Sequence, residues 1–488
     1  MSNNGGIQKK VFSSLVWAFL ERCGSQGVGL VINIVLARLL LPEDYGTLAI
    51  MVIFTNLANQ FVQSGFNTSL IQNPDVTEED YSSVLHVSLM ISAALYVLLW
   101  FTAPVIAGFY DSLGLVQPLR ALSLVLFSNS LQSVQTAKLR REMDFKTIFT
   151  LTLSASLCGG SAGVILAVFG GGVWALVAQQ LVGSVSTCVV LYLRLRWRPR
   201  AVIDWARVRV LFSYGWKLLV SALLDTFYND LTGLVIGKKY TSTMLAYYDK
   251  GQMLPNKLIS SINDSVQSVM LPALAGEQSN RERCKQMMRR SVQVSCFVLF
   301  PMIAGLAAVA EPVVTILLTE KWLPCVPFLQ LSCLIYLALP ISVANLQAIK
   351  ALGRSDVFLQ LEVIKKIIGL AALMVTVFCF DSVLAILWGS AVTSLLSLFL
   401  NAFPNKKIVG YSFSEQMRDI FPALSLAFVM FLAVSALNSL SLGVWGRFAL
   451  QIAAGVVIYV GGAVLLRLES LQYTWNILRP YAARLFHH

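Results

Sequence analysis

Charged residues and histidines are scarce in this chain of 488 residues. Asp, Glu, Lys and Arg make up 13% of the sequence, about half the share of a soluble domain, while hydrophobic residues make up 57%. The composition therefore excludes a disordered chain and an ordinary cytosolic enzyme, because too few polar side chains remain to face water. The mean hydropathy of +0.70 instead predicts an integral membrane protein.

Residues that bind metals or transfer protons are also few. Three His occur, namely His86 and the terminal pair His487–His488, so almost no imidazole is left for a metal or catalytic site. The eight Cys have no metal-ligand spacing and lie mostly in apolar runs, where we expect inert packing. A Walker A sequence is missing, which argues against ATP hydrolysis by this chain. The sequence therefore predicts a protein that is not an enzyme and needs no cofactor.

Long apolar runs are abundant. They predict about 14 membrane-spanning helices, because a bilayer crossing needs roughly 20 residues. The runs are continuous and exceed the alternating segments, about 10 residues each, of a membrane β-barrel, so we predict an all-α integral membrane protein. The predicted spans are approximately 11–37, 45–70, 82–109, 116–137, 146–169, 172–193, 211–236, 251–275, 291–318, 326–349, 357–380, 382–403, 420–438 and 443–466.

The basic residues predict the orientation. The formal net charge is +12, from 37 Lys and Arg against 25 Asp and Glu. With both termini in the cytoplasm, roughly 25 basic residues fall in cytoplasmic loops and about 7 on the opposite side, as the positive-inside rule requires. One cytoplasmic turn, Asp75 to Asp80, is acidic. The basic stretch Arg194–Arg209 is expected to contact anionic membrane lipid, and no nucleic acid partner is expected.

A weak internal repeat divides the chain near that basic stretch. Three polar residues of the first half recur in the second half at a constant offset: Gln135, Lys138 and Asp144 against Gln347, Lys350 and Asp356. Repeats of six helices keep the same orientation in the membrane. We therefore predict a six-helix bundle over residues 1–200, a second over 201–410, and two additional helices with a cytoplasmic tail over 411–488. The two bundles would surround a central cavity.

Polar residues follow helical spacing inside two spans. One face of span 45–70 carries Asn56, Asn59, Gln60 and Gln63, and span 251–275 carries Asn256, Ser260, Asn263 and Gln267. A lipid-facing helix would not carry such faces. They either line a polar cavity or form hydrogen bonds between helices, and both interpretations remain open at this point.

Charged residues inside the spans are the other candidates for function, because each costs several kcal/mol unless it faces water or a partner. Arg22 and Lys257 have no opposite charge at helix-neighbour spacing, so they are candidates to bind an anionic substrate. Lys365 and Lys366 are further candidates, although Glu362 could neutralise Lys366 at spacing i, i+4. Asp225 and Asp264 are candidate sites for a coupling proton or sodium ion.

Several short segments resemble bacterial polysaccharide exporters. Residues 36–46 read Leu-Ala-Arg-Leu-Leu-Leu-Pro-Glu-Asp-Tyr-Gly, similar to the family signature Ala-Arg-x-Leu-x-Pro-x-x-Phe/Tyr-Gly. Glu320-Lys321-Trp322, followed by Pro327-Phe328-Leu329-Gln330-Leu331, resembles the colanic acid and teichuronic acid exporter branch. The resemblance covers about residues 1–410 and is weakest in the last two spans.

This resemblance implies membership of the multidrug/oligosaccharidyl-lipid/polysaccharide superfamily, whose members alternate access between the two membrane faces. It implies a flippase that moves undecaprenyl-diphosphate-linked oligosaccharides from the cytoplasmic to the periplasmic leaflet of the bacterial inner membrane. Arg22, Lys257, Lys365 and Lys366 would then contact the diphosphate or acidic sugars. The polar residues that would line the sugar path are Asn56, Asn59, Gln60, Gln63, Asn263 and Gln267.

Alternative functions remain open. A multidrug cation exporter or a lipid II flippase would share the fold, and a glycan polymerase would be a membrane enzyme. An exporter of cations would call for an acidic, aromatic cavity, and a polymerase usually has a large periplasmic loop. A polysaccharide polymerase and a chain-length regulator are possible partners of the flippase.

Overall fold

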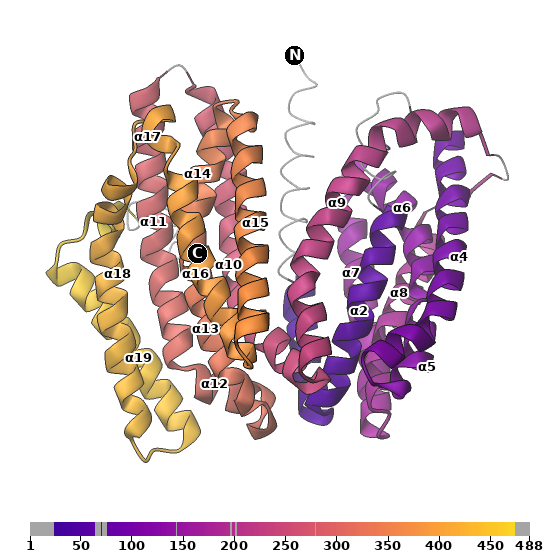
Figure 1. Cartoon of the computed structure of the whole chain (residues 1–488), viewed down its shortest axis with the longest axis horizontal. Helices are drawn as coiled ribbons and strands as arrows, with labels where there is room; N and C mark the ends of the chain where they lie inside the picture. Colours follow the sequence, from indigo (N-terminus) through magenta and orange to yellow (C-terminus); the bar gives the residue numbers. More distant parts are fainter. Residues whose placement is uncertain are drawn as a thin grey trace, which may run out of the picture. The chain divides into compact units, whose positions relative to one another are not determined.

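The computed structural model describes residues 24–63, 70, 76–142, 144–195, 198–200, 203–278 and 280–473, apart from a few side chains. Within these residues the regular structure is entirely helical (Figure 1). Ten helical segments are long and apolar enough to cross a membrane, and a shorter apolar helix covers Gly24–Leu39. The chain is therefore a multi-pass membrane protein.

The chain divides into two compact units, Met1–Ala246 and Tyr247–His488. The first unit contains, after the helix Gly24–Leu39, α2 (Pro42–Gln63), α4 (Glu78–Phe109), η1 (Leu113–Leu115), α5 (Val116–Leu122), α6 (Val125–Glu142), α7 (Phe145–Val168), α8 (Val173–Arg194) and α9 (Trp205–Lys239). The helix α10 (Ser242–Gly276) begins in the first unit and continues into the second.

The second unit continues with α11 (Arg281–Ala308), α12 (Ala310–Leu318), η2 (Glu320–Cys325), α13 (Val326–Leu337), α14 (Leu339–Ala351), α15 (Ser355–Cys379), α16 (Val383–Ala402), α17 (Asn405–Ile408), α18 (Phe413–Ala436), η3 (Leu437–Ser439) and α19 (Val444–Leu465). Every predicted span coincides with helix in the part of the chain that the structure describes.

One run of elements occurs twice along the chain. The run η1, α5, α6, α7, α8 of the first unit returns as η2, α13, α14, α15, α16 in the second. Asp144 is the N-cap of α7, whereas Asp356 is the second residue of α15, so the two aspartates lie near helix starts but at different capping positions. The compact units meet after residue 246, within α10, whereas the predicted repeat boundary lies at residue 200. The division of the chain into 1–200, 201–410 and 411–488 stays a prediction about the repeat.

Three predicted spans are broken in the structure. Span 116–137 is divided between α5 and α6, span 291–318 between α11 and α12, and span 326–349 between α13 and α14. The last break precedes Pro340, which lies in the first turn of α14. Proline suits this position because backbone N–H groups in the first turn of a helix have no partner within the helix, and proline has no N–H. These breaks lie inside apolar runs, so hydropathy alone does not reveal them.

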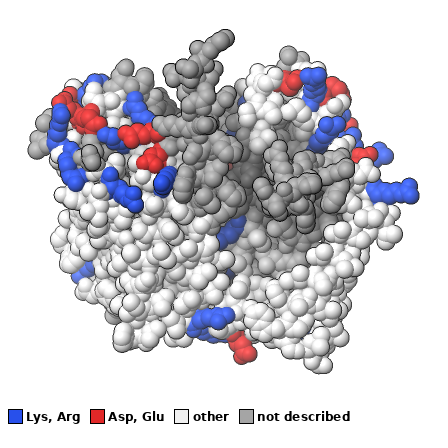
Figure 2. Space-filling model, turned by 180° about the vertical axis from the view of Figure 1, so that it is seen from behind, with Lys and Arg blue, Asp and Glu red and all other residues white. Residues whose placement is uncertain are grey.

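Small residues bring helices close together in the first unit. A Cβ atom at Gly159 of α7 would lie 2.4 Å from the carbonyl oxygen of Gln179 in α8, so no side chain fits there. Membrane helices gain little from burying apolar surface against each other, so such backbone contact is an important source of their packing energy. On the face shown in Figure 2, the charged side chains gather mainly along the upper edge, and most of the described surface below them is uncharged.

Candidate functional site

The polar face of α2 is partly occupied by hydrogen bonds inside the first unit. Asn59 accepts hydrogen bonds from the amide of Asn129 in α6, at 3.1 Å, and from that of Gln63, at 3.2 Å. Ser184 of α8 donates to Asn129 at 3.4 Å and accepts from Gln132 at 2.9 Å. Asn59 and Gln63 therefore help to hold α2, α6 and α8 together, and their contact with a substrate stays a prediction.

Other polar side chains in the first unit are exposed or half-buried. Asn56 of α2 is exposed, as are Asp225 and Asn229 of α9, while Gln60 is half-buried. The helices α2 and α9 pack against each other. Contact between lipid and exposed amides or carboxylates costs free energy. Their presence on membrane-spanning helices therefore favours water around this part of α2 and α9.

The helix α10 has two kinds of polar side chain. Asn263 is 3% exposed, and its amide has no hydrogen-bond partner among the described residues. Gln267 accepts a hydrogen bond of 2.8 Å from Gln347 of α14, which ties α10 to the second unit. Lys257 is half-buried and its neighbour Asn256 is exposed, so α10 also presents a polar edge.

The charged cluster of α15 contains an ion pair. The ammonium of Lys365 lies 2.5 Å from the carboxylate of Glu362, and both side chains are half-buried. Lys366 is half-buried. Glu362 thus pairs with Lys365 at spacing i, i+3, whereas the sequence pointed to Lys366 at spacing i, i+4.

Two predicted site residues have no described side chain. Arg22 lies outside the described residues, and so does the side chain of Asp264. Their roles stay predictions from the sequence.

The acidic turn that departs from the positive-inside rule is paired with basic residues. Glu78, Glu79 and Asp80 form the first turn of α4, where a capping box with Thr77 and the helix dipole favour carboxylates. They form ion pairs of 2.6 Å with Lys138, 3.4 Å with Arg200 and 3.6 Å with Arg207, respectively. Part of the basic stretch 194–209 is therefore bound to the protein itself.

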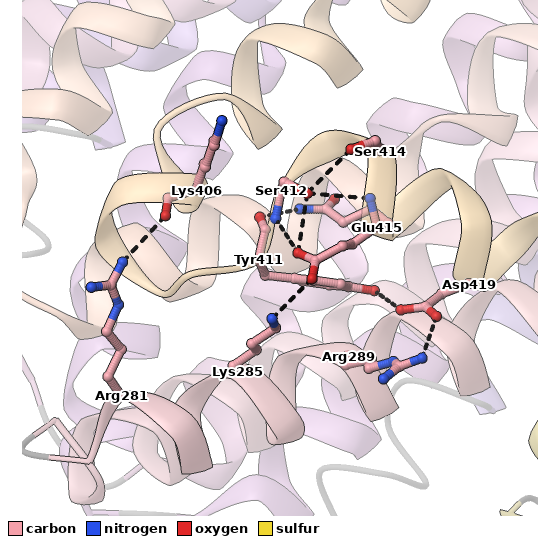
Figure 3. Close-up of polar contacts among 10 residues, drawn as sticks. Arg281, Lys285, Arg289, Lys406, Tyr411, Ser412, Ser414, Glu415 and Asp419 are labelled. Atoms are coloured by element: carbon pink, nitrogen blue, oxygen red, sulfur yellow. Dashed lines mark hydrogen bonds and ion pairs between the residues drawn. The ribbon is translucent and has the colours of Figure 1, made fainter.

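A charged cluster that the sequence did not reveal joins α11 to α18 (Figure 3). Arg289 donates to Asp419 at 2.5 Å, and Lys285 lies 3.0 Å from Glu415. Tyr411 donates to the other oxygen of Asp419 at 2.7 Å. Burial and this bond to Asp419 raise the pKa of Tyr411 above its ordinary value, so the hydroxyl keeps the proton that it donates.

Buried amides lie beside that charged cluster. Asn345 of α14 donates to Gln416 of α18 at 2.8 Å, and Asn405 of α17 donates to Asn345 at 2.8 Å. All three side chains are fully buried. The sequence carried one relevant signal, the capping box Ser412-x-x-Glu415, which starts α18 before the predicted span. The buried amides and the charged cluster hold α18 in position, and their members bond mainly to one another.

Potential metal ligands do not converge in the described part of the chain. No three His, Cys, Asp or Glu residues there are grouped so that they could hold a metal ion. His86 contacts the carbonyl oxygen of Ser82 at 2.7 Å. The polar and cationic groups of α2, α9, α10 and α15 are thus the candidates for a binding site.

Comparison with known proteins agrees with this architecture. The chain is 23% identical to the teichuronic acid biosynthesis protein TuaB of Bacillus subtilis over 93% of this chain and 95% of that protein. It is 25% identical to the succinoglycan biosynthesis transport protein ExoT of Rhizobium meliloti, over 86% of this chain and 83% of ExoT.

The fold is similar to that of the lipid II flippase MurJ in an inward closed conformation. The TM-score is 0.73 at 13% identity, and the match covers 93% of this chain and 99% of MurJ. This similarity shows a membrane transporter fold of many helices. The model of one family, described as polysaccharide biosynthesis protein, matches residues 35–327. The chain is therefore a member of this polysaccharide biosynthesis protein family, and it is a transmembrane transporter involved in polysaccharide biosynthesis.

Proposed function

We propose that this protein is a flippase for undecaprenyl-diphosphate-linked oligosaccharide repeat units. It would move them from the cytoplasmic to the outer leaflet of the bacterial inner membrane by alternating access, and it would catalyse no covalent reaction. Membership of a polysaccharide biosynthesis family supports the class of cargo. The observation that carries the proposal is the presence of exposed or half-buried polar groups within spanning helices, such as Asn56, Asn256 and Lys257.

The chemistry of the cargo fits these side chains. A sugar needs hydrogen-bonding groups, which amides provide, and a diphosphate needs cations. Arg22, Lys257 and Lys366 are the proposed cations, and Lys365 would join them only if its pair with Glu362 opened. The proposed sugar contacts are Asn56, Asn59, Gln60, Gln63, Asn263 and Gln267. Asn59 and Gln63 also hold α2 in place.

The test is an export assay in a strain that lacks the chromosomal gene. We expect Arg22→Ala and Lys257→Ala each to lower export of surface polysaccharide about tenfold or more, because a hydrogen bond to a charged group contributes about 1.5–3 kcal/mol. Arg140→Ala is the matched control, because Arg140 is exposed at the end of α6. Normal export by both variants at equal expression would remove these residues from the site.

A transmembrane gradient of protons or sodium would drive the cycle, with Asp225 and Asp264 as the proposed ion sites. Asp225 is exposed on a spanning helix, as an ion site open to water requires. Export by Asp225→Asn and Asp264→Asn should no longer respond to collapse of the gradient. An unchanged response of both variants would place the coupling site elsewhere.

The proposed orientation has both termini in the cytoplasm. A reporter that is active only in the periplasm should stay inactive when it is fused after residue 488.

The multidrug exporter alternative predicts a different phenotype: deletion would sensitise cells to cationic drugs and leave surface polysaccharide unchanged. A polysaccharide polymerase and a chain-length regulator would act on the flipped units.

A further inference from the structure

The helix α9 is attached to the first unit at both ends, although the sequence repeat makes it the first helix of the second copy. Its first turns enter an apolar cluster of the first unit, where Val208 and Leu211 are buried with Tyr81 and Val84 of α4 and Val134 of α6. In Figure 1, α9 runs beside α2. The division into compact units therefore places α9 in the first unit, whereas the sequence repeat places it in the second copy.

Hydrogen bonds fasten the segment before α9 to α4. The backbone N–H of Arg200 donates to the hydroxyl of Ser82 at 3.0 Å, and that of Asp204 donates to the hydroxyl of Ser83 at 2.9 Å. Both serines are fully buried. The ion pair between Arg207 and Asp80 lies beside these bonds. Since the donors are backbone groups, these bonds fix the main chain of residues 200 and 204 against α4.

The opposite end of α9 packs closely on α2. Gly233 and Gly237 lie on one face, four residues apart, as in helix pairs with close backbones. A Cβ atom at Gly237 would lie 3.4 Å from Ile50, and one at Gly233 would lie 3.2 Å from Ile53. The carboxylate of Asp111 then pairs with Lys238 at 3.1 Å.

The start of α10 is held by the first unit, and its next turns are held by the second. A Cβ atom at Gly46 would lie 1.8 Å from the carbonyl oxygen of Ser242, so α2 touches the first residue of α10. A Cβ atom at Gly251 would lie 2.6 Å from Cβ of Phe328 in α13. Lys250 is buried with its ammonium 5.7 Å from the ring centre of Trp322, which is fully buried. Along the sequence, the chain thus leaves the first compact unit and enters the second over residues 242–250.

We propose that α9 moves with the first unit during transport and that residues 242–250 of α10 form the hinge between two moving bodies. The boundary between the two moving bodies then lies after α9, and not at residues 200–201, where the sequence repeat divides the chain. This inference rests on the proposed function, because alternating access requires two bodies that move relative to each other.

The first test is a disulfide between α2 and α9. In a variant without the native cysteines, Ile50→Cys with Gly237→Cys would link the two helices where they touch. We expect the oxidised protein to export polysaccharide at the same rate as the reduced protein. Loss of export on oxidation, with recovery on reduction, would show that α9 separates from α2 during the cycle and would overturn the inference.

A second pair tests the other end of α9. Ser82→Cys with Arg200→Cys would link α4 to the segment before α9, and the same outcome is expected there. Ser92→Cys with Ser130→Cys is the matched control, because it links α4 to α6 where the two serine hydroxyls already touch. This control reports any damage from the oxidant.

A measurement independent of the cargo separates the hinge from the proposed function. Spin labels would be placed at Leu224 of α9, Phe101 of α4 and Phe378 of α15, which are 62%, 73% and 79% exposed. In liposomes with and without a proton or sodium gradient, the distance 224–378 should change and the distance 224–101 should stay constant. The reverse result would overturn the inference. Normal surface polysaccharide in the deletion strain would refute the proposed function, and these distances would still test the hinge.

Discussion

Asn345 lies at the centre of the buried amide cluster that contains Asn405 and Gln416. We expect Asn345→Ala to lower the free energy of unfolding by about 1–3 kcal/mol, because its partners would be left buried without hydrogen bonds. Unfolding in detergent measures the change. Arg418→Ala is the control, since Arg418 is exposed on α18, and equal stability of the two variants would contradict this role for the cluster.

Asp419 and Asp356 both pair with arginine but differ in burial. The side chain of Asp419 is 8% exposed and binds both Arg289 and Tyr411, whereas that of Asp356 is 57% exposed in its pair with Arg354. We expect Asp419→Asn to lower the free energy of unfolding by about 1–3 kcal/mol, and Asp356→Asn to have no measurable effect. A larger loss in the Asp356 variant would contradict the burial argument.

The polar residues of the candidate site show what a sequence can predict at this scale. The spacing of Asn56, Asn59 and Gln63 correctly placed them on one face of a helix. It did not reveal that Asn59 binds Asn129 while Asn56 stays exposed. That difference depends on which helix packs beside α2, and a helical period carries no information about its neighbours.

At the scale of elements, apolar length predicted where helices occur, because a bilayer leaves no other way to pair the backbone of a single segment. Hydropathy did not predict the breaks near residues 123, 309 and 338, since the surrounding sequence stays mostly apolar through each of them. Nor did it predict the early start of α18, where a capping box precedes the apolar run by several residues.

The hairpin α7–α8 gives a prediction at the same scale. Gly159→Ala should destabilise the protein by about 1–3 kcal/mol, because the added methyl group would overlap the backbone of α8. Gly108→Ala is the same substitution in α4 where nothing lies within 4 Å, so it should be neutral or slightly stabilising. Unfolding of the two variants in detergent provides the comparison, and equal stability would show that α7 and α8 pack less closely than described.

For the whole molecule, the basic surplus divides into groups with different tasks. Residues such as Arg207 and Arg289 hold elements together through ion pairs with Asp80 and Asp419. Others lie at exposed helix ends, where they would set the orientation in the membrane. Only the few inside the spanning helices, including Lys257 and Lys366, remain as candidates for cargo binding. Net charge therefore says little about the cargo.

The location of lipid-linked repeat units in a deletion strain tests the flippase most directly. An impermeant reagent that labels sugars from the periplasmic side would distinguish units on the two leaflets. We predict that units accumulate and remain unlabelled until the membrane is opened, and that the intact gene restores their labelling. Units that are fully labelled in the deletion strain, with the polymer still missing, would contradict the account and indicate a step after flipping.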